Sequence, residues 1–84
     1  MDDRGYTRHW PTLHRQRLAN VRRLFSDLKR EGMSQRTIAA ILGMTLEKLE
    51  RVVDAQLMID DAMAREIEWA VHRPRGWLDD EISM

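Results

Sequence analysis

Apolar residues recur along the chain at the spacing of amphipathic α-helices, and short polar turns separate the repeats. The first such stretch is predicted to open at Pro11 or Thr12, because proline suits a first helical turn and threonine suits an N-cap. It is predicted to end at Gly32, since glycine adopts the left-handed conformation that closes a helix. Its apolar stripe consists of Leu18, Val21, Leu24, Phe25 and Leu28. The arginines of this helix are expected on the opposite, solvent-facing side.

Three shorter helices are predicted to follow the first. Their N-cap residues are Ser34, Thr45 and Asp60. Gly43 closes the second helix, and Pro74 with Gly76 breaks the fourth. The apolar positions of the second helix are Ile38, Ala39, Ile41 and Leu42, and those of the fourth are Met63, Ile67, Ala70 and Val71. The third helix is expected to turn Leu46, Leu49, Val52 and Val53 inward or partly inward. The pattern predicts an all-α fold, a small four- to five-helix bundle whose last turn lies around Trp77 and Leu78.

Residues 34–53 have the outline of a helix-turn-helix. Two helices joined by a turn of three or four residues cross steeply only where small residues meet. Ala39 is small at the expected crossing, Gly43 supplies the turn four residues later, and Leu49 points back into the core. Val52 follows one helical turn further on. This spacing predicts that the second helix of the pair is held clear of the body of the domain.

The length of 84 residues allows one small domain, which we place at residues 12–84 after a flexible N-terminal arm at residues 1–11. The chain is 43% hydrophobic and 33% charged, a composition typical of an ordered helical domain. It contains no cysteine and no apolar run of the roughly 18 residues that a membrane span needs. The expectation is therefore a cytoplasmic protein that does not associate with membranes.

Charge is distributed unevenly although the net charge is zero. Up to Arg36 the chain carries nine basic residues against four acidic ones, whereas the remainder carries five basic residues against ten acidic ones. A basic half attracts phosphates and an acidic half repels them. The same asymmetry also suits a merely solvated surface, so charge alone does not decide the type of partner.

Two parts of the chain resemble one known family. The Ala-Gly-Leu-Val spacing above and residues 59–81 are similar to the lambda-repressor-like (Cro/C1-type, XRE) helix-turn-helix DNA-binding domains of phage and prophage regulators. In the second part, an Ala-Arg-x-Ile-Glu helix leads into Pro-x-Gly-Trp-Leu-Asp. The matching residues are Ala64, Arg65, Ile67, Glu68, Ala70, Pro74, Gly76, Trp77, Leu78 and Asp79. The resemblance covers roughly residues 20–81 and implies a five-helix fold, a cytoplasmic location, a homodimer and control of transcription.

The resemblance also implies which residues meet double-stranded operator DNA. The start of the second helix would grip a phosphate, and the third helix would lie in the major groove. These residues are Ser34, Gln35, Arg36, Thr45, Leu46, Glu47, Lys48 and Arg51. Arg51 would form a bidentate hydrogen bond with guanine, Glu47 would accept a hydrogen bond from cytosine, and Leu46 would touch a thymine methyl group. Lys48 would reach a phosphate. Glu47 and Arg51 are equally well spaced for an exposed ion pair without any DNA, and that alternative stays open.

The loop after the third helix departs from the family pattern. These domains usually present Asn, Gly or basic residues to the DNA backbone there, whereas residues 54–60 contain two aspartates and no basic residue. Leu57 and Met58 indicate either a protein-facing patch or burial against the core. The alternative function is therefore a protein-binding module, docking through the Asp54–Asp61 loop, that modulates a host regulator or polymerase subunit without specific DNA binding. On a DNA-binding domain, Arg4 and Arg8 of the arm would compensate by reaching a groove.

No motif in the chain indicates catalysis or a cofactor. His9, His14 and His72 are scattered, so no metal site is expected. A phosphate-cradling glycine loop and a nucleophile elbow are absent from the sequence, and we do not expect an enzyme. The three tryptophans are expected in the core or at a subunit contact. They are Trp10, Trp69 and Trp77.

Overall fold

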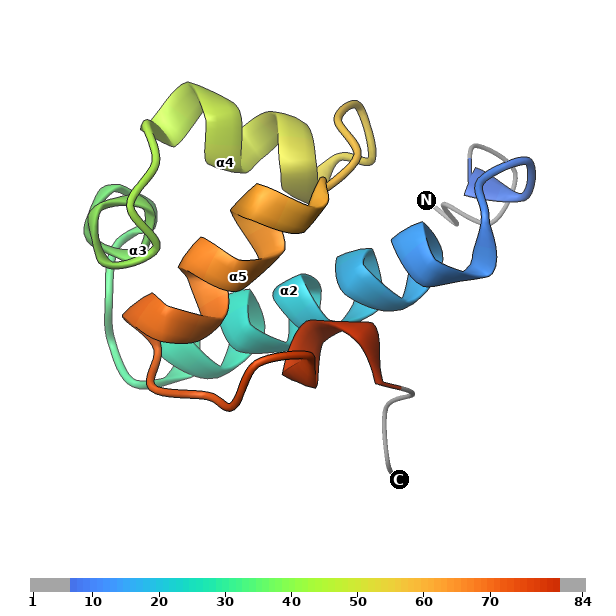
Figure 1. Ribbon diagram of the computed structural model, residues 1–84. Helices are drawn as coiled ribbons and strands as arrows, with labels where there is room; N and C mark the ends of the chain where they lie inside the picture. The colour runs from blue at the N-terminus through green and yellow to red at the C-terminus, as the bar shows by residue number, and fades with distance from the viewer. Residues whose placement is uncertain (1–6, 81–84) are drawn as a thin grey trace.

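The computed structural model describes residues 7–80, and all regular secondary structure within that range is helical (Figure 1). The elements are α2 (Thr12–Arg30), α3 (Gln35–Ile41), α4 (Leu46–Val53), α5 (Asp61–Ala70) and the short 3-10 helix η1 (Trp77–Asp79). The long helix α2 packs against α3, α4 and η1, and α5 packs against η1. The predicted all-α bundle, with a short turn after Gly76, is confirmed.

The helices begin where the capping residues predict. Each of the three expected caps accepts a hydrogen bond from the backbone N–H three residues later. These bonds are Thr37 N to Ser34 Oγ at 3.1 Å, Lys48 N to Thr45 Oγ1 at 3.1 Å, and Met63 N to Asp60 Oδ1 at 2.8 Å. The first helix, α2, begins at Thr12 directly after Pro11 and has no side-chain cap. The caps at Ser34, Thr45 and Asp60 each satisfy one of the backbone N–H donors that a helix leaves without a partner at its start.

The helices α2, α3, α4 and α5 end in one hydrogen-bonding pattern, closed around a residue in the left-handed conformation. After α3, Gly43 N donates to Ala40 O at 3.1 Å and Met44 N donates to Ala39 O at 3.0 Å, with Gly43 at φ 76°. The left-handed residues that close these four helices are Gly32, Gly43, Ala55 and His72. The break between α3 and α4 therefore follows from Gly43 as predicted. A residue with a Cβ occupies the same position after α4 and α5, at a steric cost.

The core is formed mainly by the predicted stripes. The fully buried apolar residues are Leu18, Val21, Leu24, Ile38, Ala39, Leu42, Leu49, Val52, Ile59, Met63, Ala64, Ile67 and Leu78. Ile59, Ala64 and Leu78 were not assigned inward from the pattern. Several residues of the predicted stripes are only half-buried, namely Phe25, Leu28, Ile41, Leu46, Val53, Ala70 and Val71. The stripes thus identify the inner face of every helix, but they miss the residues that the loops and η1 contribute.

Arg17 contradicts the expectation that the arginines of the first helix face solvent. Its side chain is 2% exposed. The guanidinium donates from Nε to Asp79 Oδ1 at 2.7 Å, from Nη2 to Asp61 Oδ1 at 2.6 Å, and from Nη1 to the carbonyl of Ile59 at 2.8 Å. The physical reason is position, because Arg17 lies one helical turn before Val21 on the inward face. A buried guanidinium is tolerated when its donors are satisfied, as they are here.

Two further buried polar side chains hold η1 in place. Asn20 on α2 donates from Nδ2 to the carbonyls of Leu78 at 2.9 Å and Asp80 at 2.8 Å. Glu68 on α5, which is 1% exposed, accepts from the backbone N–H groups of Gly76 at 3.0 Å and Leu78 at 2.8 Å. The segment after α5 is therefore fixed to two helices by side-chain to backbone hydrogen bonds.

The predicted arm lies partly outside the described residues, and Arg4 is among those not described. In the described part, Thr7 is buried and its carbonyl accepts from Trp10 N at 2.8 Å. Arg8 and His9 are exposed. Among residues 7–80, none of the helices combines the length and apolar character needed to span a bilayer.

Candidate nucleic-acid interface

The pair formed by α3 and α4 is held together by the core. Ala39 on α3 and Leu49 and Val52 on α4 are each no more than 2% exposed and belong to one buried cluster. The two helices pack against each other, and each also packs against α2. Figure 1 shows α4 at the outer edge of the molecule, on the side away from η1. The inner side of α4 is thus fixed by apolar contacts, and its opposite side faces solvent.

The outer face of α4 carries Glu47, Lys48, Glu50 and Arg51, all of them exposed. None of these four side chains forms an ion pair with another residue in the range 7–80. The Glu47–Arg51 pair that the spacing allowed is therefore not formed. Three of the predicted DNA contacts, Glu47, Lys48 and Arg51, lie together on this face with their charged groups available to a partner.

The outer face of α4 is electrically balanced, with two carboxylates and two cations. Glu47 lies in the first turn of the helix and Arg51 in the last. A negative group near a helix N-terminus and a positive group near its C-terminus both interact favourably with the helix dipole. The order of charges along α4 therefore stabilises the helix itself, whatever the outer face contacts.

The start of α3 brings three more of the predicted residues to the surface, since Ser34, Gln35 and Arg36 are exposed. The Ser34 hydroxyl is already engaged, because it accepts from Thr37 N and also donates to Thr37 Oγ1 at 3.0 Å. The Gln35 amide and the Arg36 guanidinium have no hydrogen-bond partner among the described residues. Gln35 and Arg36 are thus the side chains of this group that are available to a ligand.

The remaining two predicted residues have roles within the fold. Thr45 is exposed, and its Oγ1 accepts the N-cap hydrogen bond from Lys48 N. Leu46 is half-buried and packs against the core cluster. Thr45 therefore fixes the start of α4, and Leu46 contributes mainly to the attachment of α4 to the body of the domain.

Arg22 is a basic residue of α2 whose role was not predicted. Its Nε donates to the carbonyl of Val53, the last residue of α4, at 2.8 Å. This bond satisfies a carbonyl at the helix C-terminus and ties α4 to α2. The signal in the sequence was weak, namely that Arg22 lies one helical turn from both Leu18 and Phe25 on the apolar stripe. Arg22, like Arg17, is therefore used to build the fold.

The acidic loop after α4 is anchored rather than free. Ile59 is 1% exposed and Leu57 packs against the core, whereas Met58 is 39% exposed. The carbonyl of Ile59 is held by Arg17 as described above. Of the two apolar residues that suggested a protein-facing patch, Leu57 is half-buried against the core and Met58 is exposed.

Neither family models, nor curated proteins, nor solved structures give a match to this chain. Within the described range, His, Asp and Glu side chains do not gather in any group of three that could hold a metal ion. Any assignment of function must therefore come from the geometry of the α3–α4 pair and its surface chemistry.

Proposed function

We propose that this protein is a DNA-binding transcriptional regulator of the phage or prophage repressor type, acting in the cytoplasm. In this proposal α4 enters the major groove of an operator, and the start of α3 meets the phosphate backbone. The observation that carries the proposal is the outer face of α4, where Glu47, Lys48 and Arg51 are exposed and unpaired on a helix whose inner side is fixed in the core.

The rigidity of the attachment favours recognition of a fixed surface. The N-cap at Thr45, the buried Leu49 and the hydrogen bond from Arg22 to Val53 hold α4 at its start, middle and end. A helix fixed in this way presents its side chains at set positions, as base recognition in a groove requires. Arg51 would form a bidentate contact with guanine, and Arg36 and Lys48 would neutralise phosphates.

The direct test is a fluorescence-anisotropy titration of duplexes from the promoter region of the protein's own gene, at about 50 and 200 mM salt. The proposal predicts tighter binding to one duplex than to a scrambled duplex of equal length, with affinity that falls steeply as salt increases. On that duplex, Arg51→Ala should cost roughly 1 to 3 kcal/mol of binding free energy. Equal affinity for the specific and scrambled duplexes would count against the proposal.

Arg15→Ala is the matched control for Arg51→Ala. Arg15 is an exposed arginine in the first half of α2, and within residues 7–80 its side chain donates one hydrogen bond to another side chain, a long one of 3.5 Å to Thr12. Each substitution removes one positive charge, so any loss caused by net charge alone appears in both variants. A loss in affinity confined to Arg51→Ala indicates a contact at α4.

Leu57 no longer supports the protein-binding alternative, because its side chain packs against the core. An acidic substitution at Leu57 would destabilise the fold and give no information about a partner. Met58→Asp is the usable variant, since Met58 is 39% exposed. Unchanged DNA affinity in Met58→Asp, together with reduced affinity in Arg51→Ala, is the combination that the DNA proposal predicts.

A further inference from the structure

Trp69 on α5 is 83% exposed, far more than any other large apolar residue in the range 7–80. The expectation that the tryptophans lie in the core is therefore wrong for Trp69, although a subunit contact remains open. Trp77, by comparison, packs against the core, and the guanidinium carbon of Arg73 lies 4.9 Å from the centroid of its ring. A tryptophan presents roughly 150 to 250 Å² of largely apolar surface, which is costly to leave in water.

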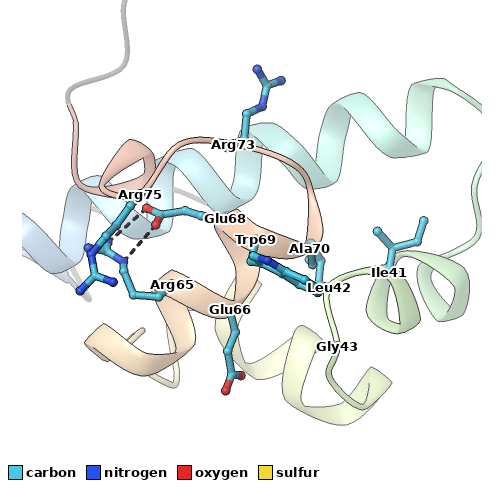
Figure 2. Close-up of a pocket in the computed structure, with 10 residues that line it drawn as sticks. All are labelled: Ile41, Leu42, Gly43, Arg65, Glu66, Glu68, Trp69, Ala70, Arg73 and Arg75. Atoms are coloured by element: carbon cyan, nitrogen blue, oxygen red, sulfur yellow. Dashed lines mark hydrogen bonds and ion pairs between the residues drawn. The ribbon is translucent and has the colours of Figure 1, made fainter.

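A surface hollow adjoins this side chain (Figure 2). Its volume is about 650 Å³, and its lining includes Trp69 and Ala70 of α5 together with Ile41, Leu42 and Gly43 from the end of α3. The same turn at Gly43 leads into α4. The apolar surface is therefore contiguous with the turn that positions the proposed DNA-binding helix, and it does not overlap the outer face of α4.

The charges around Trp69 are arranged so that two copies of this surface would fit each other. Glu66 lies three positions before Trp69 in the sequence and Arg73 four positions after it. Both are exposed, and Figure 2 shows them pointing to opposite sides of Trp69. If a two-fold axis passes near Trp69, two antiparallel α5 helices place Glu66 of each copy opposite Arg73 of the other. Each copy thus contributes one residue to each of two symmetric ion pairs, Glu66 from α5 and Arg73 from the turn that follows α5.

We infer that this face joins two copies of the chain in a two-fold homodimer, with Trp69 at its centre and Glu66–Arg73 pairs on either side. An exposed aromatic anchor flanked by charged residues is typical of an interface hot spot. The zero net charge of the chain imposes no overall repulsion between copies. The contact between Arg73 and the ring of Trp77 limits the positions open to the guanidinium, which lowers the entropy lost when the ion pair forms.

The dimer surface goes beyond the proposed function, since it requires no DNA. It would set two α4 helices at a fixed separation, which is how dimeric regulators read two half-sites. Self-association is measured without DNA and DNA affinity is measured separately, so either proposal can fail while the other stands.

Sedimentation equilibrium of the full chain without DNA, from micromolar to near-millimolar concentration, tests the interface. The expected result is a concentration-dependent dimer. Trp69→Ala should weaken association at least about thirtyfold, the effect of losing a hot-spot residue. Met58→Ala, which truncates an exposed apolar residue outside the proposed surface, should leave association unchanged.

A charge exchange tests the symmetry itself while Trp69 is kept. Glu66→Arg and Arg73→Glu should each weaken association about three- to tenfold. The variant carrying both substitutions should restore it, because each pair re-forms with its charges reversed. A monomer at all concentrations, a dimer unaffected by Trp69→Ala, or a double variant no tighter than the single ones would overturn the inference. Circular dichroism of each variant verifies that the fold is retained.

Discussion

The guanidinium of Arg17, near the start of α2, lies 2.7 Å from the carboxylate of Asp79, the last residue of η1. Arg17 also reaches Asp61, the first residue of α5. Arg65, on the next turn of α5, lies 3.0 Å from the same Asp79 carboxylate. One cluster of ion pairs thus joins the first part of α2 to α5 and η1. The α3–α4 pair lies in the sequence between Arg17 and Asp61.

Loss of the Arg17 side chain should destabilise the protein without changing the outer face of α4. We expect Arg17→Met to lower the free energy of unfolding by about 2 to 3 kcal/mol. The estimate lies at the low end for a broken buried ion pair, because Asp61 is exposed and stays hydrated. Urea denaturation measures the effect, and Arg15→Met, at an exposed site on the same helix, should change stability by less than about 0.5 kcal/mol. Equal effects of the two substitutions would contradict a structural role for Arg17.

Stability should fall in acid because of Asp79. The hydrogen bond from Arg17 lowers the pKa of Asp79 below its ordinary value, burial of the carboxyl opposes this shift, and the hydrogen bond from Arg65 adds to it. Since the pKa is lower in the folded state, the stabilisation is present above the unfolded-state pKa of about 3.9 and is lost as pH falls through the folded-state pKa. Unfolding free energies measured between about pH 6 and 2 should decline below about pH 4. Asp79→Asn should be less stable at neutral pH and show a shallower decline in acid. A parallel decline in both proteins would be inconsistent with this assignment.

Ala55 offers a site where glycine should stabilise the protein. It follows α4 at φ 61°, a conformation in which a Cβ costs energy and which glycine adopts freely. We expect Ala55→Gly to raise the free energy of unfolding by about 0.5 to 1 kcal/mol, after the greater entropy of glycine in the unfolded chain is subtracted. Ala40→Gly is the control, because Ala40 lies within α3 and the substitution there should destabilise by a similar amount. Thermal denaturation of both variants should show shifts of opposite sign.

The elements were predictable because their signals are local. Ser34, Thr45 and Asp60 act on backbone groups three residues away, and Gly43 acts on its own φ angle. The apolar stripes predicted which side of each helix faces the core. Sequence alone therefore gave the order of the helices, their approximate limits and most of the buried apolar residues.

The polar interior was not predictable in the same way. Arg17 and Glu68 lie on the stripes of α2 and α5, but the burial of such a residue depends on its hydrogen-bond partners. Ile59 and Asp61, which accept from Arg17, are more than 40 positions away in the sequence. Gly76, which donates to Glu68, is 8 positions away. For Trp69 the prediction of burial was wrong, because hydrophobicity favours burial and only the packing of α5 determines which side of this helix is exposed to solvent. For the candidate DNA interface, the sequence predicted exposure of Arg36, Lys48 and Arg51. It gave Leu46 two roles, one on the inward side of its helix and one at a thymine methyl group, and in the structure Leu46 is half-buried against the core.

Removal of a carboxylate from α4 should strengthen general DNA binding. Glu50 is exposed and unpaired on the outer face of this helix, so it would repel phosphates in the bound state. We expect Glu50→Gln to increase affinity for random duplex several-fold at low salt, with a smaller gain at high salt. Asp80→Asn is the control, because Asp80 directly follows η1. Figure 1 shows η1 on the side of the molecule away from α4. Equal gains from both substitutions would show that net charge alone is responsible.

DNA binding through α4 is tested most directly by an amide chemical-shift titration, in which the ¹⁵N-labelled protein is titrated with its own promoter duplex and the perturbed residues are mapped. If α4 enters the major groove, the largest changes fall at Gln35, Arg36 and the exposed residues of α4, with little change along η1. Perturbations confined to the Asp54–Asp61 loop, or no perturbation by any duplex up to millimolar concentration, would contradict binding through α4.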